Sequence, residues 1–448
     1  MATELRRLSH VSVEGLFGLF NHEIPLKVDD HITLVHGPNG YGKTVMLRML
    51  EGLLGSHFAV FYDIPFRRFQ ISFTDGSSVG VVQDQDRQLP GMPRIHKVQL
   101  RVEWDDAFRG RSNRETPKRP STSDLRTGVS MIEEEVPELV RIGVRAWKRT
   151  TTGEVLTLDD VLDRYPHLAG DEAAVVSEDL QNLLASVQVL FIDTDRLSTF
   201  ASMPGVRSPM RTPTVTAVAK DIDRHIQETL AASAGNSASL DRSFPKRLID
   251  GLRDNPPDTS DILSQMALAE IKRQRLEDLG LFDKETTRID EMSLDELAEI
   301  SHAAIHVMNL YVTDVLQKLA FFDDLTGRIS TLTQIINEQF SFKDVSVSKD
   351  HGFLISCAIA SEALDAKNLS SGEQHQLVMW YRLLFETQPG TLVLIDEPEI
   401  SLHVGWQVRF LRYLLEVVAL SGCDVLITTH SPQIINDRWD LTVELTAS

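Results

Sequence analysis

Cysteine is scarce in this chain of 448 residues, which contains only Cys357 and Cys423. Both lie in apolar stretches typical of strands, and two thiols supply neither a disulfide framework nor a cysteine-rich metal site, so we expect them to be packed inside. Long apolar runs are also missing: no stretch approaches the roughly 18 apolar residues that span a membrane, and the amino terminus lacks the apolar core of a signal peptide. We therefore expect a soluble, cytoplasmic protein without membrane contact.

Basic residues are fewer than acidic ones: the chain has 45 Lys and Arg residues and 65 Asp and Glu residues, which gives a formal net charge of −20. Such a balance opposes nonspecific wrapping of nucleic acid over the surface. One local exception is the basic stretch from Arg109 to Arg119, which carries no aromatic residue for stacking on bases. The acidic run Glu133 to Glu138 follows it. The stretch predicts either a solvated loop or a contact with phosphate or an acidic protein, so direct nucleic-acid binding stays open.

The most informative motif is GPNGYGKT, from Gly37 to Thr44, which follows the apolar run HITLVH and precedes a segment with helical spacing. It is the phosphate loop G-x-x-x-x-G-K-S/T in the strand-loop-helix context that the loop needs. Its backbone N–H groups and the helix N-terminus favour anions, so we expect ATP to bind here. Lys43 is expected to reach the β- and γ-phosphates, and the Thr44 hydroxyl to bind Mg²⁺. The predicted cofactor-binding residues of this loop are Gly37, Pro38, Asn39, Gly40, Tyr41, Gly42, Lys43 and Thr44.

A second motif, LVLIDEPE, is a continuous apolar run that ends in carboxylates. This pattern is typical of a buried parallel strand with functional residues at its carboxyl end. We expect Asp396 to hold Mg²⁺ and Glu397 to act catalytically by polarising the attacking water. The alternative is that both acids are exposed and only end the strand.

A third motif, LSSGEQ, places a Ser-Gly pair at the start of a helical segment. Alone it could be an ordinary helix cap, but the helix N-terminus also suits a phosphate. The motif resembles the signature motif of ABC-type ATPases, which contacts the γ-phosphate bound to the opposite subunit. The resemblance implies a homo-oligomer with paired ATP sites, in which these residues bind the neighbour's nucleotide: Ser370, Ser371, Gly372 and Glu373.

Other positions agree with that family. His430, after the apolar run DVLIT, stands where the family has a switch histidine that senses the γ-phosphate, and we predict it to be catalytic; the alternative is a structural histidine. Ser401 to His403 occupy the place of the D-loop, which crosses the dimer interface. Tyr41 departs from the small residue found in many phosphate loops, and a backbone cradle tolerates this.

Three positions leave alternatives open. The Q-loop glutamine could be Gln70 or Gln83, although Gln70 could also be an ordinary strand residue. Arg196, in FIDTDRL, could face the nucleotide or close a structural ion pair.

The resemblance extends over roughly the first 100 and last 110 residues. The opening segment resembles the amino-terminal sheet of Rad50-, RecF- and OLD-type ATPases, and DEPEISLHVGWQ with ITTHSPQII closely resembles the OLD-related AAA-family ATPases. It implies an α/β fold with an ABC-type P-loop ATPase domain built from N- and C-terminal segments, and an inserted helical domain. The expected divisions are residues 1–100 (N-terminal half of the ATPase domain), 101–200 (its continuation, with the basic and acidic insertion), 201–340 (helical insertion) and 341–448 (C-terminal half).

The helical periodicity from Val215 to Gln339 shows breaks at Gly235, at Pro256 and Pro257, and at Gly280. Its longest uninterrupted pattern, Ser293 to Leu325, is far too short for a DNA-bridging rod. The sequence ends soon after His430, and we expect no nuclease domain beyond it.

The favoured interpretation is the ATP-binding and hydrolysing sensor or scaffold subunit of a two-component anti-phage defence system. The chain looks like stand-alone OLD-related ATPases such as those of PARIS-type (AriA) and Septu-type (PtuA) systems, the former slightly preferred. This implies a separate TOPRIM-like nuclease effector, a phage-encoded trigger protein, and no nuclease activity of the chain itself. The alternative is a RecF- or Rad50-like DNA-repair ATPase that binds DNA directly.

Overall fold

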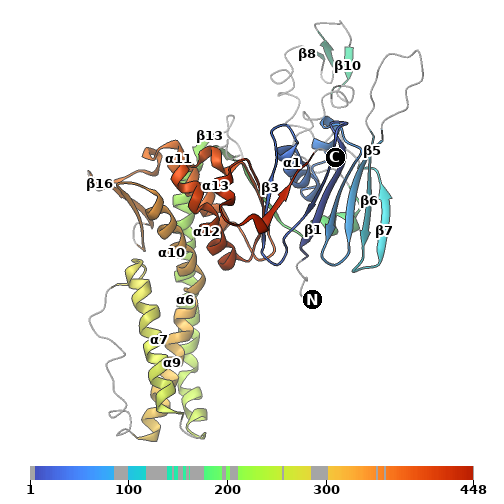
Figure 1. Cartoon of the computed structure of the whole chain (residues 1–448). Coiled ribbons are helices and arrows are strands. Elements are labelled where there is room, and N and C mark those ends of the chain that lie inside the picture. Colours follow the sequence, from blue (N-terminus) through green and yellow to red (C-terminus); the bar gives the residue numbers. More distant parts are fainter. Residues whose placement is uncertain are drawn as a thin grey trace, which may run out of the picture. The chain divides into compact units, whose positions relative to one another are not determined.

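The computed structural model describes residues 6–84, 99–117, 139–143, 146–149, 155–157, 161, 176–193, 198–201, 210–254, 257–283, 301–349, 352–357 and 360–446 (Figure 1). The chain divides into two compact units, and each is described by itself. Unit 1 comprises Met1–Thr194 and Thr387–Ser448, and unit 2 comprises Asp195–Glu386. The finer division at residues 100, 200 and 340 stays a prediction.

Unit 1 contains a parallel sheet built from both ends of the chain. Its strand order is β11 (Val189–Asp193), β17 (Leu392–Asp396), β18 (Asp424–Thr429), β3 (Ile32–His36) and β19 (Thr442–Glu444). The apolar runs of β3, β17 and β18 are almost entirely buried, as continuous hydrophobic strands in parallel sheets are. Because β3 pairs with both β18 and β19, the sheet forms only when the N- and C-terminal segments meet.

Helices follow the motif-bearing strands of this sheet. Helix α1 (Lys43–Leu54) begins directly after the phosphate loop and contacts β11 and β17. Helix α12 (Val404–Ser421) ends at Gly422, whose φ of 67° is readily adopted only by glycine. Shorter elements lie between them: η4 (Pro398–Ser401), α13 (Pro432–Ile435) and η5 (Trp439–Leu441).

A second, antiparallel sheet completes most of unit 1. Its order is β2 (Phe20–Pro25), β1 (Leu8–Leu16), β4 (Arg68–Phe73), β5 (Ser78–Asp84), β6 (Gln99–Asp106) and β7 (Arg111–Glu115). Strand β4 alternates buried Phe69, Ile71 and Phe73 with partly exposed polar residues, so one face joins the core and the other is polar. Unit 1 also contains α2 (Val60–Asp63), α5 (Glu178–Leu184), and the three-stranded sheet β10 (Val155–Thr157), β9 (Ala146–Arg149) and β8 (Leu139–Gly143).

The described part of the basic stretch is not a loop throughout, because Arg111–Glu115 forms edge strand β7 paired with β6. Its charges are matched by acids on neighbouring elements. Arg111 Nη1 lies 2.6 Å from Asp179, and Arg114 Nε lies 3.3 Å from Glu103. Cross-strand pairing overrode the loop-like composition, and residues 118 and 119 lie outside the described part of the chain.

Unit 2 is dominated by long helices. Figure 1 shows α6 (Thr214–Gly251), α7 (Thr259–Asp278) and α9 (His302–Ala320) running alongside one another. Arg247 of α6 forms a paired contact with Asp314 of α9, with Nη2 at 2.7 Å from Oδ2. The remaining elements are β12 (Ser198–Ala201), β13 (Met210–Pro213), α10 (Asp323–Gln339), β14 (Lys343–Ser348), β15 (Gly352–Cys357), β16 (Ala360–Leu364), η3 (Ala366–Asn368) and α11 (Ser371–Phe385).

Helix boundaries correct two sequence-based expectations. Gly235 lies inside α6, which also contains Pro245, so the predicted break there is wrong; packing against the neighbouring helices outweighs a helix-propensity cost of about 1 kcal/mol. Of the predicted helix from Ser293 to Leu325, residues 293–300 lie outside the described part of the chain, α9 begins after its N-cap Ser301, and the helix is interrupted again at Phe321 and Phe322, between α9 and α10. The charges near the break favour two separate helices: Lys318 in the last turn of α9 and two aspartates in the first turn of α10 both interact favourably with the helix dipoles.

Other expectations agree with the structure. Gly280, with a φ of 70°, closes the end of α7, and α6 and α7 are separate helices on either side of the predicted proline break. Cys423 is fully buried as expected, whereas Cys357 is only half-buried, and neither forms a disulfide. Among the described residues, no helix is long and apolar enough to cross a membrane.

Candidate nucleotide site

The register of the parallel sheet gathers several predicted residues at one edge. Asp396 at the end of β17 is level with Thr428 of β18, and Thr429 is level with His36, which precedes the phosphate loop. Because parallel strands end at the same edge, the loop, the acidic pair and His430 emerge together. Within unit 1 the structure thus brings together Lys43, Thr44, Asp396, Glu397 and His430.

The phosphate loop has the backbone of an anion cradle. Gly40 and Gly42 both have a φ of 83°, a left-handed conformation that favours glycine. A Cβ on Gly42 would lie 2.5 Å from Leu16 Cδ2, so packing against β1 also requires glycine there. Gly42 caps α1 without a side-chain hydrogen bond, which leaves the N–H groups of the first turn directed at the loop. Pro38, Asn39 and Gly40 are exposed at the loop tip.

Lys43 is buried at the base of the loop, with 5% of its surface exposed. Its Nζ donates to Gly37 O at 3.0 Å and to Pro38 O at 3.1 Å, and lies 3.5 Å from His430 Nδ1. Burial lowers the pKa of the Lys43 ammonium, while three nearby carboxylates oppose this shift by favouring the charged form. The amine is therefore held beside the loop where a polyphosphate would lie.

The predicted metal ligands lie side by side. Thr44 Oγ1 donates to Asp396 Oδ1 at 3.1 Å, and the Thr428 hydroxyl donates to the same oxygen. Adjacent ligands of an octahedral Mg²⁺ are about 3 Å apart, since each Mg–O distance is about 2.1 Å. The Thr44 and Asp396 oxygens therefore fit a shared Mg²⁺, and Thr428 fixes the carboxylate.

Glu397 and His430 form a second pair at this edge. Glu397 has a left-handed backbone, with a φ of 44° and a ψ of 58°, which costs a non-glycine residue on the order of 1 kcal/mol. Its Oε1 lies 3.4 Å from His430 Nε2, with both side chains partly exposed. Residues held in such strained conformations cluster at active sites and ligand-binding positions.

Glu399 is a member of this site that the sequence reasoning missed. Its Oε1 accepts a 2.6 Å hydrogen bond from the backbone N–H of His430, and its Oε2 is buried without a hydrogen-bond partner. The available signal was the third acid of DEPE, two residues beyond the catalytic candidate. Because the Glu399 carboxylate binds the backbone N–H of His430, it fixes the position of the backbone from which the imidazole side chain extends.

The predicted signature residues lie in unit 2, at the start of α11. Ser370 is the N-cap and forms a capping box with Glu373, whose Oε2 also accepts from Lys343 Nζ at 2.6 Å. These two side chains therefore form the helix cap that the sequence allowed, and their predicted contact with a neighbour's nucleotide stays a prediction. Ser371 is exposed and Gly372 is half-buried, and neither residue belongs to the capping box.

Neither Q-loop candidate has a free side chain. Gln83 is buried; its Nε2 donates to Phe61 O at 3.1 Å and to Ile64 O at 3.2 Å. Gln70 Oε1 accepts from Arg68 Nε at 3.0 Å on strand β4. Arg196 lies outside the described residues. Gln70 thus bonds within strand β4, and Gln83 joins strand β5 to α2 and the segment that follows it.

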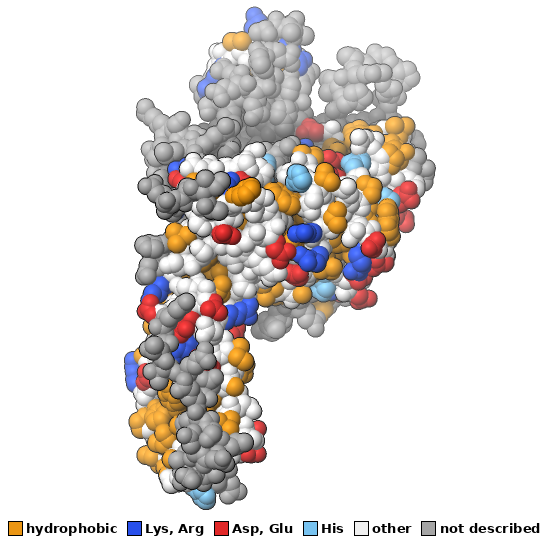
Figure 2. Space-filling model, turned by 60° about the vertical axis from the view of Figure 1, so that its left-hand side comes forward, with side chains coloured by type: hydrophobic (Ala, Val, Ile, Leu, Met, Phe, Trp, Pro, Cys, Tyr) orange, Lys and Arg blue, Asp and Glu red, His pale blue; other side chains and the backbone are white. Residues whose placement is uncertain are grey.

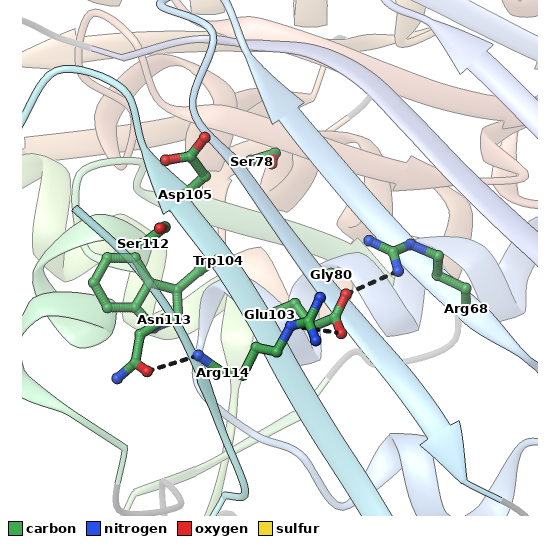
Figure 3. Close-up of a pocket in the computed structure, with 9 residues that line it drawn as sticks. All are labelled: Arg68, Ser78, Gly80, Glu103, Trp104, Asp105, Ser112, Asn113 and Arg114. Atoms are coloured by element: carbon green, nitrogen blue, oxygen red, sulfur yellow. Dashed lines mark hydrogen bonds and ion pairs between the residues drawn. The ribbon is translucent and has the colours of Figure 1, made fainter. Parts of the chain in front are cut away.

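A depression on unit 1 lies elsewhere, over strands β4 to β7, and has a volume of about 430 Å³. Figure 3 shows Arg68 and Arg114 reaching Glu103 from either side. Its lining includes none of the motif residues, and its arginines are paired with a carboxylate. On the face shown in Figure 2, blue and red side chains of the described residues are intermixed. Neither observation supports the DNA-binding alternative.

Comparison with known proteins gives one family match. Residues 275–436 match a family model described as "AAA domain, putative AbiEii toxin, Type IV TA system". The matched segment contains Asp396, Glu397 and His430 but not the phosphate loop. No curated protein matches the chain.

Several solved structures are similar at low identity. A Smc head domain of Pyrococcus furiosus with an extended coiled coil, bound to the C-terminal domain of ScpA, is 11% identical with a TM-score of 0.36 over 99% of this chain and 94% of that one. The SMC head domain from Thermotoga maritima is 11% identical with a TM-score of 0.33 over 98% and 95%. A SmcHead bound to the C-winged helix domain of ScpA is 10% identical with a TM-score of 0.33 over 96% and 91%. Likeness at this level adds nothing about activity or partners.

The fold class is the predicted one. The protein is α/β, with an ABC-type P-loop ATPase domain formed from N- and C-terminal segments and an inserted helical domain. The phosphate loop lies between β3 and α1, and Asp396 ends β17 of the same sheet with Glu397 directly after it, which is the arrangement of a P-loop nucleotide site.

Proposed function

We propose that this protein binds Mg²⁺-ATP at the carboxyl edge of the parallel sheet and hydrolyses it. The observation that carries the proposal is the 3.1 Å contact of Thr44 with Asp396, directly beside Lys43 and the Glu397–His430 pair. Lys43 binds the phosphates, and Mg²⁺, held by Thr44 and Asp396, neutralises phosphate charge. Glu397 orients and polarises the attacking water, and His430 contacts the terminal phosphate.

The ATP site is completed by a second copy of the chain. Ser371 and Gly372 stand at the start of the 15-residue helix α11, where backbone N–H groups favour an anion, and Ser371 is exposed. The D-loop residues Ser401 to His403 adjoin an exposed apolar stripe. Its members recur every four residues and are 64%, 57% and 46% exposed: Ile400, Val404 and Val408. An apolar stripe next to the acidic pair suits an interface that closes over the nucleotide.

The cellular role in this proposal is that of a sensor or scaffold subunit which controls a separate nuclease effector in anti-phage defence. Support comes from the resemblance to OLD-related ATPases and from the matched family model, whose description names a Type IV TA system. The chain itself is proposed to cleave no nucleic acid. Its own chemistry is ATP turnover, and a TOPRIM-like partner and a phage-encoded trigger supply the rest.

Mixing two inactive variants tests the composite site. Lys43→Ala removes phosphate binding in its own chain, and Ser371→Arg blocks the proposed contact with the neighbour's nucleotide. In a dimer that contains one chain of each variant, one ATP site is intact and the other carries both substitutions. Since half of the dimers are mixed, ATPase activity should recover to about a quarter of the wild-type rate while each variant alone stays inactive.

Ser264→Arg is the matched control, because Ser264 is exposed on α7 of the same unit, away from the signature. It should hydrolyse ATP like the wild type. If the confirmed mixture stays inactive, or if Ser371→Arg alone is fully active, the composite site is wrong and each chain binds ATP by itself.

A further inference from the structure

A buried histidine lies directly behind the phosphate loop. His22 is on strand β2, where Phe20, His22 and Ile24 form the inward face, and only 3% of its surface is exposed. Its Nε2 lies 2.9 Å from the carbonyl oxygen of Tyr41, inside the loop. Because a carbonyl oxygen can only accept, Nε2 must carry the proton. Burial lowers the pKa of His22, although the bond to Tyr41 opposes this shift.

The side chain of Tyr41 is held by the same strand. Its ring stacks on Phe20 with a centroid distance of 4.9 Å and an interplanar angle of 29°, and lies 6.4 Å from the His22 ring. Phe20 and His22 also stack, at 5.6 Å. Strand β2 therefore contacts both the ring and the carbonyl of the one bulky residue between Gly40 and Gly42.

The carbonyl contact determines which way the next N–H points. In a trans peptide the C=O and N–H bonds are antiparallel, so a Tyr41 carbonyl directed at His22 turns the Gly42 N–H away from β2. Glycine at position 42 is required by its φ of 83° and by the 2.5 Å approach of Leu16. Glycine, however, also tolerates the opposite sign of φ, so rotation of this peptide would be easy without the histidine.

We propose that His22 is a positioning residue, which fixes the Tyr41–Gly42 peptide so that the Gly42 N–H is directed at a bound polyphosphate. The inference rests on the proposed binding of ATP at this loop. Its alternative is a core histidine that satisfies one carbonyl and affects stability only. The two readings differ in nucleotide affinity, because a purely structural histidine leaves a folded loop equally able to bind.

Two substitutions separate these readings. His22→Phe keeps an aromatic ring in the stack and removes the donor, whereas His22→Gln keeps an N–H donor. We expect His22→Phe to weaken ATP and ADP binding about tenfold and to raise KM with kcat nearly unchanged, since loss of a hydrogen bond to a loop that must be ordered costs about this much. His22→Gln should recover most of the affinity. His10→Phe, the same change on β1 away from the loop, should bind like the wild type.

The controls distinguish this inference from the proposed function. If the wild type does not bind ATP, the proposed function itself fails. If the wild type binds, Lys43→Ala does not, and folded His22→Phe binds as tightly as the wild type, then His22 has no positioning role. Should His22→Phe not fold, NMR of the wild type labelled with ¹⁵N-histidine remains decisive. A neutral His22 ring with its proton on Nδ1, with or without ADP, would overturn the inference.

Discussion

The nucleotide edge of unit 1 and the helices of unit 2 use charged side chains in different ways. In unit 1, Lys43, Asp396, Glu397 and His430 crowd one sheet edge; Lys43 contacts carbonyls and the histidine, and Glu397 is strained. In unit 2, acids and bases pair with each other across elements, as Arg247 does with Asp314 and Lys343 with Glu373. The first arrangement gathers charges where a ligand would bind, and the second uses them to hold helices and strands in place. The type of a charged residue therefore does not show whether it has a functional or a structural role. The group that its side chain contacts does.

The largest effect should come from Glu397→Gln, which keeps the shape of the side chain and removes its basicity. If unit 1 holds the chemistry, ATP hydrolysis should fall at least about a hundredfold, the usual contribution of a general base, while ATP binding persists. Lys43→Ala should instead lose ATP affinity, because it removes a phosphate-binding charge. Single-turnover hydrolysis and equilibrium ATP binding measure the two effects separately.

Glu416→Gln is the matched control, since Glu416 is exposed on α12 of the same unit. It should hydrolyse and bind ATP like the wild type. Hydrolysis by Glu397→Gln at the wild-type rate would remove Glu397 from the chemistry and leave the charge cluster of unit 1 unexplained.

Much of the site in unit 1 could be predicted because each motif is local. A buried strand followed at once by polar residues indicates both the strand and its functional end, and the parallel register then places Asp396 level with Thr428. Contacts between distant segments could not be predicted. Two examples are the hydrogen bond from His430 N–H to Glu399 and the one from His22 to Tyr41. No local sequence pattern indicates that these segments meet.

In unit 2 the difficulty was tertiary packing. Gly235 and Pro245 argue against one continuous helix, yet α6 passes through both. Propensity is a weak guide where a helix packs against neighbours along its length. Lys343 likewise had no local feature to mark it as the partner of Glu373, because it lies on a separate strand.

A smaller effect should follow from breaking the Arg247–Asp314 pair in unit 2. Asp314 is 5% exposed, so Asp314→Ala leaves an arginine without its carboxylate at a helix contact. We expect the free energy of opening of α6 and α9 to fall by about 2 kcal/mol, measured by hydrogen exchange. ATP affinity should not change, because the pair does not touch the nucleotide site. Loss of ATP affinity would show that the charges of unit 2 are not purely structural.

Asp241→Ala is the control for that measurement. Asp241 pairs with Lys318 across the same two helices, but its side chain is 68% exposed. Exposed pairs contribute less than about 1 kcal/mol, so exchange in α6 and α9 should change little. An equal effect of both variants would mean that burial does not set the strength of these pairs.

The smallest effect should come from Glu373→Gln. Glu373 caps the start of α11, next to the residues proposed to contact a neighbour's nucleotide. Burial raises the pKa of Glu373, but bonds from Lys343 and Ser370 outweigh it and hold the pKa below its ordinary value of 4.5. A lowered carboxylate pKa stabilises the folded state above pH 4.5, and this contribution is lost as the pH falls through the folded pKa. At pH 7 the variant should lower the opening free energy of the first turn of α11 by about 1 kcal/mol, the usual worth of a helix cap. Below the folded pKa, the opening free energies of the variant and the wild type should converge.

Glu386→Gln is the control, because Glu386 lies at the exposed other end of α11, and it should show neither effect. A difference for Glu373→Gln that does not depend on pH would mean that the neutral side chain, and not the charge paired with Lys343, caps this helix.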